Sequence, residues 1–165
     1  MLEYFEKLAS SIIFKSDGKP YWVVSPAKAA PVGSLAGTIN SSGHRQINCT
    51  IAGVRKQILA HRVLWFVETK SIPTFRLDHK DRDPDNNIIS NLRPATQAEN
   101  MQNKGVYRNN KLGVLGVSKH SASGFNAAIQ IAGVQHSHWF KTLTEAIAWR
   151  KAKEVELHPF RPVIQ

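Results

Sequence analysis

Residues 75–103, FRLDHKDRDPDNNIISNLRPATQAENMQN, hold most of the chemically active side chains of the chain. A short apolar run ends in an Asp-His pair, and an acidic, Asn-rich loop follows it. Further on, Thr96 and Glu99 have the spacing of a capping box, which predicts the start of a helix. Two strands joined by this loop and followed by that helix would bring four polar side chains together: Asp78, His79, Asn91 and Asn100.

These four side chains meet the needs of metal-assisted phosphodiester hydrolysis. Asp78 and Asn100 supply oxygen ligands for a hard cation, which binds the scissile phosphate and stabilises the departing oxyanion. His79 is the candidate general base for the attacking water, because imidazole exchanges protons near neutral pH. Asn91 is the candidate side chain that holds the imidazole ring in one tautomer.

The segment resembles the HNH family of homing and nicking endonucleases found in phages and introns. The blocks AHRVLWFV, LDHKD, DNNIISNLR and PATQAEN occur in the order and spacing of that family. The resemblance implies a ββα-metal fold, with Asp78 and Asn100 as ligands of one metal ion per site, His79 as general base and Asn91 as the residue that positions it. The broad family often has a final histidine where this chain has Asn100, and an amide oxygen favours Mg²⁺ or Mn²⁺ over Zn²⁺.

The acidic loop also has features of a calcium-binding loop and of a simple turn. Asp81, Asp83 and Asp85 imitate the first ligands of an EF-hand, but Asn86 stands where glycine is needed and Leu92 where the bidentate glutamate belongs. The tetrapeptide DPDN at 83–86 is typical of a turn. Two alternatives to a nuclease stay open: a non-catalytic DNA-binding regulator on a decayed HNH scaffold, and an RNA-binding module.

Charge and hydropathy indicate the class of partner. The net charge is +10, and six of the twelve acidic residues lie in 61–104, so both flanks are basic. Basic flanks suit duplex DNA, because Lys and Arg contacts to phosphates supply much of its affinity. No apolar run approaches the roughly 20 residues that cross a bilayer. We therefore expect a cytoplasmic protein of a phage-infected cell, without membrane contact, acting as a monomer or homodimer, with Cys49 as a buried thiol in a strand.

The pattern of turns and apolar residues predicts an α+β chain. The dipeptide Asp17-Gly18 predicts a hairpin over 12–25, and further strands are expected at 35–39, 44–50 and 54–59, followed by a short helix at 60–67 that carries His61 as a structural histidine. The predicted organisation is an N-terminal antiparallel β region at 1–59, an HNH core at 60–104, a basic linker at 105–113, a DNA-binding domain at 114–158 and a tail at 159–165.

The C-terminal segment is predicted to form a three-stranded antiparallel sheet packed on one helix. The strands are expected at 116–120, 124–131 and 135–140, and the helix at 143–157, where Thr142 and Glu145 form a second capping box. The pieces GVSKH, SGFNAAIQIAG, HWFKTLTEAIAW and ELH resemble the APETALA-type (ethylene-response-factor) DNA-binding domain, with Phe125 where that family commonly has Trp. The resemblance implies that the exposed face of the sheet enters the major groove of DNA.

Several side chains are candidate DNA contacts because they are basic or lie on a predicted polar strand face. Trp139, Phe140 and Trp149 are instead expected in the core of the C-terminal segment. The candidate contacts are Arg45, Arg55, Lys56, Arg62, Arg93, Lys104, Arg108, Lys111, Ser118, Lys119, His120, Asn126, Gln130 and His136.

Overall fold

The computed structural model describes residues 1–103, 105–106, 110–120, 123–158 and 160. The chain forms two compact units, Met1–Gln97 and Ala98–Gln165. Both combine helices with antiparallel sheets, so the predicted α+β class is confirmed. Within the described residues, every helix is too short or too polar to span a membrane.

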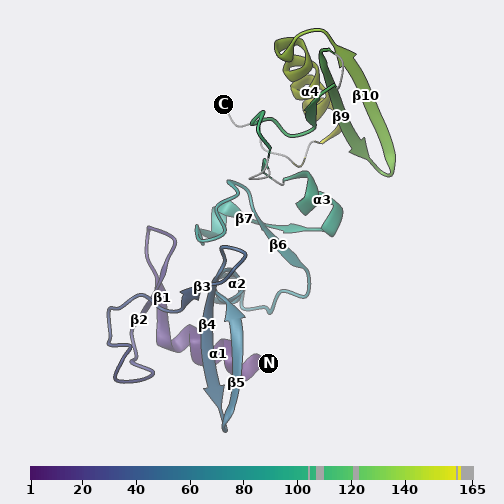
Figure 1. The fold of residues 1–165 in the computed structure, drawn as a ribbon. Coiled ribbons are helices and arrows are strands. Elements are labelled where there is room, and N and C mark those ends of the chain that lie inside the picture. Colours follow the sequence, from purple (N-terminus) through teal and green to yellow (C-terminus); the bar gives the residue numbers. More distant parts are fainter. Residues whose placement is uncertain (104, 107–109, 121–122, 159, 161–165) are drawn as a thin grey trace. The chain divides into compact units, whose positions relative to one another are not determined.

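The first unit begins with a helix, a hairpin and a three-stranded sheet (Figure 1). Asp17-Gly18 forms the predicted hairpin turn, and Gly18 has a φ of +73°. The strand expected at 35–39 is shorter in the structure and covers only residues 38–39. The elements are α1 (Leu2–Ser11), β1 (Ile12–Phe14), β2 (Pro20–Trp22), β3 (Thr38–Ile39), β4 (Arg45–Ile51), β5 (Val54–Leu59) and α2 (Ala60–Thr69).

One hydrophobic core joins these elements. Phe5 and Leu8 on α1 meet Ile47 on β4 and Val63 and Phe66 on α2. Side chains alternate along β4, so every second one points into this core. The predicted boundary between 59 and 60 therefore lies inside a shared core, and the N-terminal β region packs as one body with the helix that follows it. Cys49 on β4 is a buried free thiol, as predicted.

The central segment has the predicted order of strand, loop, strand and helix. Strand β6 (Arg76–His79) pairs antiparallel with β7 (Leu92–Ala95), and the 3₁₀ turn η1 (Ile89–Asn91) leads into β7. Helix α3 (Gln97–Gln102) starts directly after Thr96. This is the start that the spacing of Thr96 and Glu99 predicts. The loop between the strands, residues 80–91, is called the acidic loop below.

The second unit contains a sheet in the order β10-β9-β8 with one helix along it (Figure 1). Its elements are β8 (Val117–Lys119), β9 (Phe125–Ile131), β10 (Val134–Phe140) and α4 (Leu143–Leu157). The capping box is confirmed: Thr142 Oγ1 accepts from the Glu145 backbone N–H, and the Glu145 carboxylate accepts from the Thr142 N–H. These elements agree closely with the predicted ranges.

The aromatic residues of the second unit divide between the two faces of its sheet. Phe140 and Trp149 pack against the small core of Val117, Ala127 and Ala146, as expected. Trp139 is different: 48% of its surface is exposed, and its indole N–H donates to the Ser123 carbonyl at 3.1 Å. The prediction that Trp139 belongs to the core is wrong, because neighbouring strand residues point to opposite faces.

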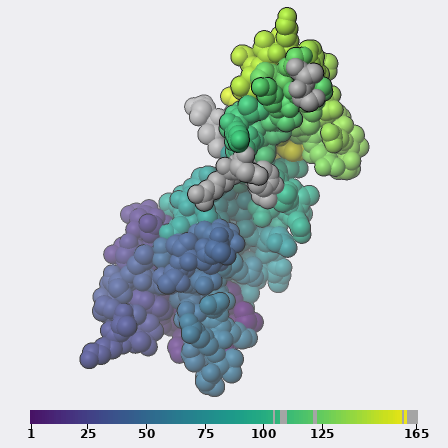
Figure 2. All heavy atoms as spheres, in the orientation of Figure 1, coloured from purple at the N-terminus to yellow at the C-terminus, as the bar shows by residue number. Residues whose placement is uncertain are grey.

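Two glycine turns of the first unit press against the acidic loop. A Cβ on Gly18 would lie 2.9 Å from the Asn87 backbone nitrogen, and one on Gly43 would lie 2.8 Å from Pro84. The Gly18 carbonyl also accepts from the Asn87 N–H at 3.1 Å. In Figure 2 the blue segment that contains the turn at 40–43 lies beside the teal acidic loop, in agreement with these contacts. The N-terminal turns therefore support the loop from outside.

This support predicts a difference between two glycines of similar backbone conformation. Gly18 and Gly53 have φ values of +73° and +78°, but a Cβ on Gly53 meets nothing within 4 Å. Gly53→Ala should lower the free energy of unfolding by about 1–2 kcal/mol from backbone strain alone. Gly18→Ala adds overpacking and should cost roughly 2–4 kcal/mol. Urea titration of both variants checks the ranking, and equal losses would show that Gly18 has no supporting contact.

Candidate active site

The end of β6 carries the Asp-His pair into the interior of the first unit. Asp78 and His79 are 6% and 5% exposed. Asp78 lies opposite Arg93 in the β6–β7 register, so both side chains project from the same face of the ribbon. The Arg93 guanidinium forms an ion pair with Asp78 Oδ2, with Nε at 2.9 Å and Nη2 at 2.8 Å. Arg93, a predicted DNA contact, is thus engaged by the predicted metal ligand.

The acidic loop is closed by hydrogen bonds around Asp81. The Asn91 side chain donates to Asp81 Oδ1 and to the Asn86 carbonyl, both at 2.9 Å, and accepts from the Asp81 N–H at 3.1 Å. Asn86 Nδ2 donates to Asp81 Oδ2 at 2.6 Å. Burial raises the pKa of the Asp81 carboxyl, but the hydrogen bonds from Asn86 and Asn91 outweigh burial and leave this pKa below its ordinary value. Asn91 therefore fixes the shape of the loop.

Asn87, which sequence reasoning did not single out, contacts the His79 ring. Its Oδ1 lies 3.3 Å from His79 Nε2, and the residue is 1% exposed. Asn87 Nδ2 donates to the Asp85 carbonyl at 3.0 Å, which fixes the orientation of the amide. Both amide hydrogens of Asn91 are bonded elsewhere, so the expected positioning of His79 by Asn91 is corrected to Asn87. In the sequence, the adjacent asparagines at 86–87 indicate only a turn and do not predict the contact with His79.

An amide oxygen can only accept a hydrogen bond, which determines the tautomer of His79 in this contact. Because Asn87 Oδ1 faces the ring, Nε2 carries the hydrogen. The lone pair of the neutral ring is then on Nδ1. A histidine held in this way can take a proton from a water molecule at Nδ1.

Two further histidines surround His79. The His61 ring lies edge-on to it with centroids 5.1 Å apart, and the His44 ring lies 5.7 Å away. Burial, and then the neighbouring imidazoles, lower the pKa of His61 to about 3, and burial also lowers the pKa of His44. The sequence predicts a structural role for His61 and gives no sign of His44, because nothing in the local sequence predicts that a turn at 40–43 reaches the end of β6.

Two of the predicted DNA contacts of the first unit are held within the protein. Arg45 is 6% exposed and forms a bidentate ion pair with Asp85. Arg45 Nε donates to Asp85 Oδ1 and Arg45 Nη2 donates to Asp85 Oδ2, each at 2.8 Å. Arg45 shares its side of β4 with Ile47, a pattern visible in the sequence. Arg62 donates to the carbonyls of Phe75 and Pro73. The Arg45 guanidinium is therefore not presented to a phosphate, which corrects that expectation, whereas the half-buried Arg62 keeps its DNA contact as a prediction.

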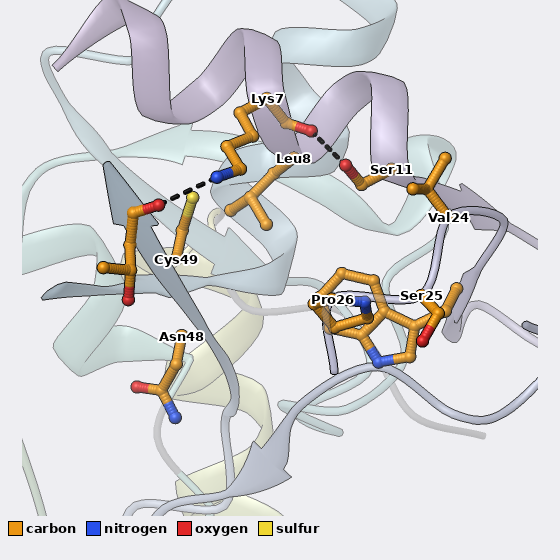
Figure 3. Close-up of a pocket in the computed structure, with 10 residues that line it drawn as sticks. Lys7, Leu8, Ser11, Val24, Ser25, Pro26, Asn48 and Cys49 are labelled. Atoms are coloured by element: carbon orange, nitrogen blue, oxygen red, sulfur yellow. Dashed lines mark hydrogen bonds between the residues drawn. The ribbon is translucent and has the colours of Figure 1, made fainter. Parts of the chain in front are cut away.

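Strand β5 keeps its predicted basic side chains at the surface. Arg55 is exposed, and Lys56 is half-buried with its ammonium 4.9 Å from the centre of the Tyr4 ring. A pocket of about 320 Å³ also lies in this unit, between α1 and β4 (Figure 3). Lys7 bridges it by donating to the Thr50 carbonyl at 2.8 Å. None of the Asp78, His79 or Asn87 side chains lines this pocket, so it is separate from the candidate site.

In the second unit, strand register sorts the predicted DNA contacts by face. Ser118 pairs with Asn126. Gln130 lies four residues after Asn126 on β9 and therefore on the same face. His136 shares its face with His138, whose ring stacks on Trp149 of α4, so the expectation that His136 lies on the open face is wrong. Lys119 pairs with the core residue Phe125 and also belongs to the helix side.

The remaining predicted residues are placed as follows. Lys111 and His120 are exposed, while Lys104 and Arg108 lie outside the described residues. Asn100 is half-buried on α3 and belongs to the second unit, so its approach to Asp78 stays a prediction. The Asp78 carboxylate and the Asn100 amide each offer oxygen, the donor atom that a hard cation such as Mg²⁺ prefers.

Three comparisons relate the chain to known proteins. Residues 59–102 match the HNH endonuclease family, which confirms the HNH resemblance. The chain is 30% identical to Protein 3.8 of Escherichia phage T7 over 100 residues, which cover 59% of this chain and 83% of that protein. A solved structure titled "DNA binding and cleavage by the HNH homing endonuclease I-HmuI" aligns with 98% of this chain and 91% of its own, at 18% identity and a TM-score of 0.42.

Burial of neutral His61 predicts a dependence of stability on pH. Its pKa falls from 6.5 to about 3 on folding, so below pH 6.5 the unfolded chain takes up a proton that the folded chain does not. Each such proton lowers the free energy of unfolding by about 1.4 kcal/mol per pH unit. Urea titrations between pH 7 and about pH 5 should show this loss, and His61→Gln should flatten it. The exposed His120→Gln is the control; identical slopes in wild type and His61→Gln would contradict the assignment.

Proposed function

Since the chain belongs to the same family as Protein 3.8 of Escherichia phage T7 and carries an HNH endonuclease domain, we propose that it is a metal-dependent endonuclease that hydrolyses phosphodiester bonds in duplex DNA. The biological class proposed is a homing endonuclease of the phage type. The observation that carries the proposal is the buried His79, which is held by Asn87 and directly follows the buried Asp78 at the end of β6.

Asp78 and Asn100 are proposed to hold one Mg²⁺ or Mn²⁺ ion. Such an ion supplies positive charge for the scissile phosphate and for the oxyanion that leaves. Arg93 neutralises part of the charge of Asp78 through Oδ2 and keeps the carboxylate in place. Arg93 thus acts on the site through Asp78, whereas sequence reasoning gave it a contact to DNA.

His79 is proposed to take the proton of the attacking water at Nδ1. Its Nε2–H stays on Asn87 Oδ1, and the positive charge that develops on the ring strengthens this hydrogen bond. Asn87 is in turn held by the Asp85 carbonyl and by the Gly18 carbonyl. The acidic loop therefore acts as the support that keeps the ring in one orientation while a proton moves.

The proposal predicts metal-dependent cutting that needs His79. Supercoiled plasmids that carry phage or host fragments should become open-circle or linear DNA with Mg²⁺ or Mn²⁺ and stay intact with EDTA. Loss of a general base lowers a rate by about 10²–10⁴-fold, so His79→Ala should leave little cleavage while it still binds DNA.

The exposed His120→Ala is the matched histidine control. As a residue of the DNA-binding unit it should change affinity and keep the rate on saturating DNA. Tight DNA binding by the wild type without cleavage by either metal would instead support a non-catalytic DNA-binding regulator. The ratio of open-circle to linear product separates nicking by a monomer from double-strand cleavage by a homodimer.

The second unit is proposed to read duplex DNA as an APETALA-type domain. Its open sheet face carries Ser118, Asn126 and Gln130, and Trp139 is exposed there beside Asn126 in the register. The major groove of DNA admits β-strands, and amide side chains recognise adenine there through paired hydrogen bonds. The other candidate contacts proposed are Arg55, Lys56, Arg62, Lys104, Arg108, Lys111 and His120.

The two faces of this sheet give a paired test of DNA reading. Each good base contact is worth about 1–3 kcal/mol, so Asn126→Ala or Gln130→Ala should weaken binding to the cognate site by roughly 5- to 150-fold. His136→Ala, on the helix side of the same sheet, should leave affinity within about twofold. Fluorescence anisotropy with labelled duplexes measures all three. A larger loss for His136→Ala than for Asn126→Ala would show that the open face does not read DNA.

A further inference from the structure

Three histidines from three separate elements converge in the first unit. His44 follows the turn at 40–43, His61 lies in the first turn of α2, and His79 ends β6. One nitrogen of each ring lies within 4.8 Å of the others, and the ring centroids are 5.1–5.7 Å apart. Such a cluster presents ligand atoms to a shared central point.

The chemistry of this cluster differs from that of the Asp78 and Asn100 oxygen pair. Neutral imidazole nitrogens suit Zn²⁺, Cu²⁺ and Ni²⁺, whereas Mg²⁺ prefers oxygen. Zinc sites with three histidines keep a fourth position for water, with Zn–N distances of about 2.0–2.1 Å. Tetrahedral geometry at that length needs nitrogens roughly 3.4 Å apart, so the rings must close slightly around an ion. His44 can make this adjustment because it is half-buried, while His61 and His79 are fixed by burial.

We propose that His44, His61 and His79 form a binding site for a Zn²⁺-like transition-metal ion, and that an ion in this site inhibits DNA cleavage. The inhibition rests on the proposed function, since it needs His79 as the general base. A neutral imidazole has one basic lone pair. His79 therefore cannot ligate an ion and take a proton from water at the same time. The partly accessible His44 is the member through which an ion reaches the two buried rings.

The cluster also has a consequence for the purified protein. The proposed Asp78 and Asn100 oxygen pair suits hard cations such as Mg²⁺ and Mn²⁺, whereas imidazole nitrogens suit Zn²⁺. Traces of zinc would thus occupy the histidine site before magnesium fills the other one. Activity should rise when a zinc-selective chelator is added in the presence of excess Mg²⁺.

Metal binding can be measured without any cleavage assay. Isothermal titration of wild-type protein with Zn²⁺, and visible absorption on titration with Co²⁺, should both give one ion per chain. His44→Ala should weaken Zn²⁺ binding at least tenfold, and the exposed His120→Ala should leave it unchanged. Equal affinities in all three proteins would overturn the site. Circular dichroism reports folding, and His44→Gln repeats the test should the alanine variant fail to fold.

The inhibitory effect is measured in the plasmid assay with Mg²⁺ and increasing Zn²⁺. Wild-type cleavage should fall as the site fills, and His44→Ala should lose a smaller fraction of its own zinc-free rate at the same Zn²⁺ concentrations. Full binding of Zn²⁺ without loss of cleavage would overturn the inhibitory role and leave the metal site. Absence of cleavage under every condition would instead count against the proposed nuclease activity, and the binding titrations would still decide the metal site.

Discussion

The ion pair between the buried Arg45 and the partly buried Asp85 connects the N-terminal sheet to the acidic loop, and the candidate site depends on that connection. Both oxygens of Asp85 accept from Arg45 at 2.8 Å, and the Arg45 side chain is 6% exposed. Loss of one partner from such a pair costs several kcal/mol, because the other charge stays buried. The pair therefore specifies where the loop sits more than it adds net stability. Gly18 and Gly43 bring their turns close to the same loop.

From this support, a chain of short contacts leads to His79. The backbone of Asp85 accepts from the Asn87 amide, and the other end of that amide contacts the His79 ring. Asp81, held by Asn86 and Asn91, closes the remainder of the loop. The acidic loop of the HNH segment therefore depends on contacts from the N-terminal region. The region supplies Arg45, the glycine turns and His44, none of which belongs to the strand-loop-strand-helix segment.

Local signals predicted the elements, and long-range contacts decided the roles. The Asp17-Gly18 turn, the second capping box and the order of strands and helices follow from neighbours in the sequence, and the structure confirms them. Asn87 and Asn91 could not be distinguished, because both are asparagines in one loop and only the folded contacts separate them. The basic character of Arg45 suggested a DNA contact. Its position two residues before Ile47 and four before Cys49 instead places it on the inward face of the strand. His44 needed the tertiary fold, since a turn residue 35 positions before His79 carries no local sign of meeting it.

The central claim is that His79 is the general base of a DNA endonuclease, and chemical rescue tests it most directly. Single-turnover cleavage of a plasmid substrate would be measured for wild type and His79→Gly, with and without added imidazole. The account predicts a loss of about 10²–10⁴-fold in His79→Gly and a partial return of the rate as imidazole concentration rises, since free imidazole can occupy the vacated position and accept the proton. Cleavage by His79→Gly at the wild-type rate without imidazole would contradict the account.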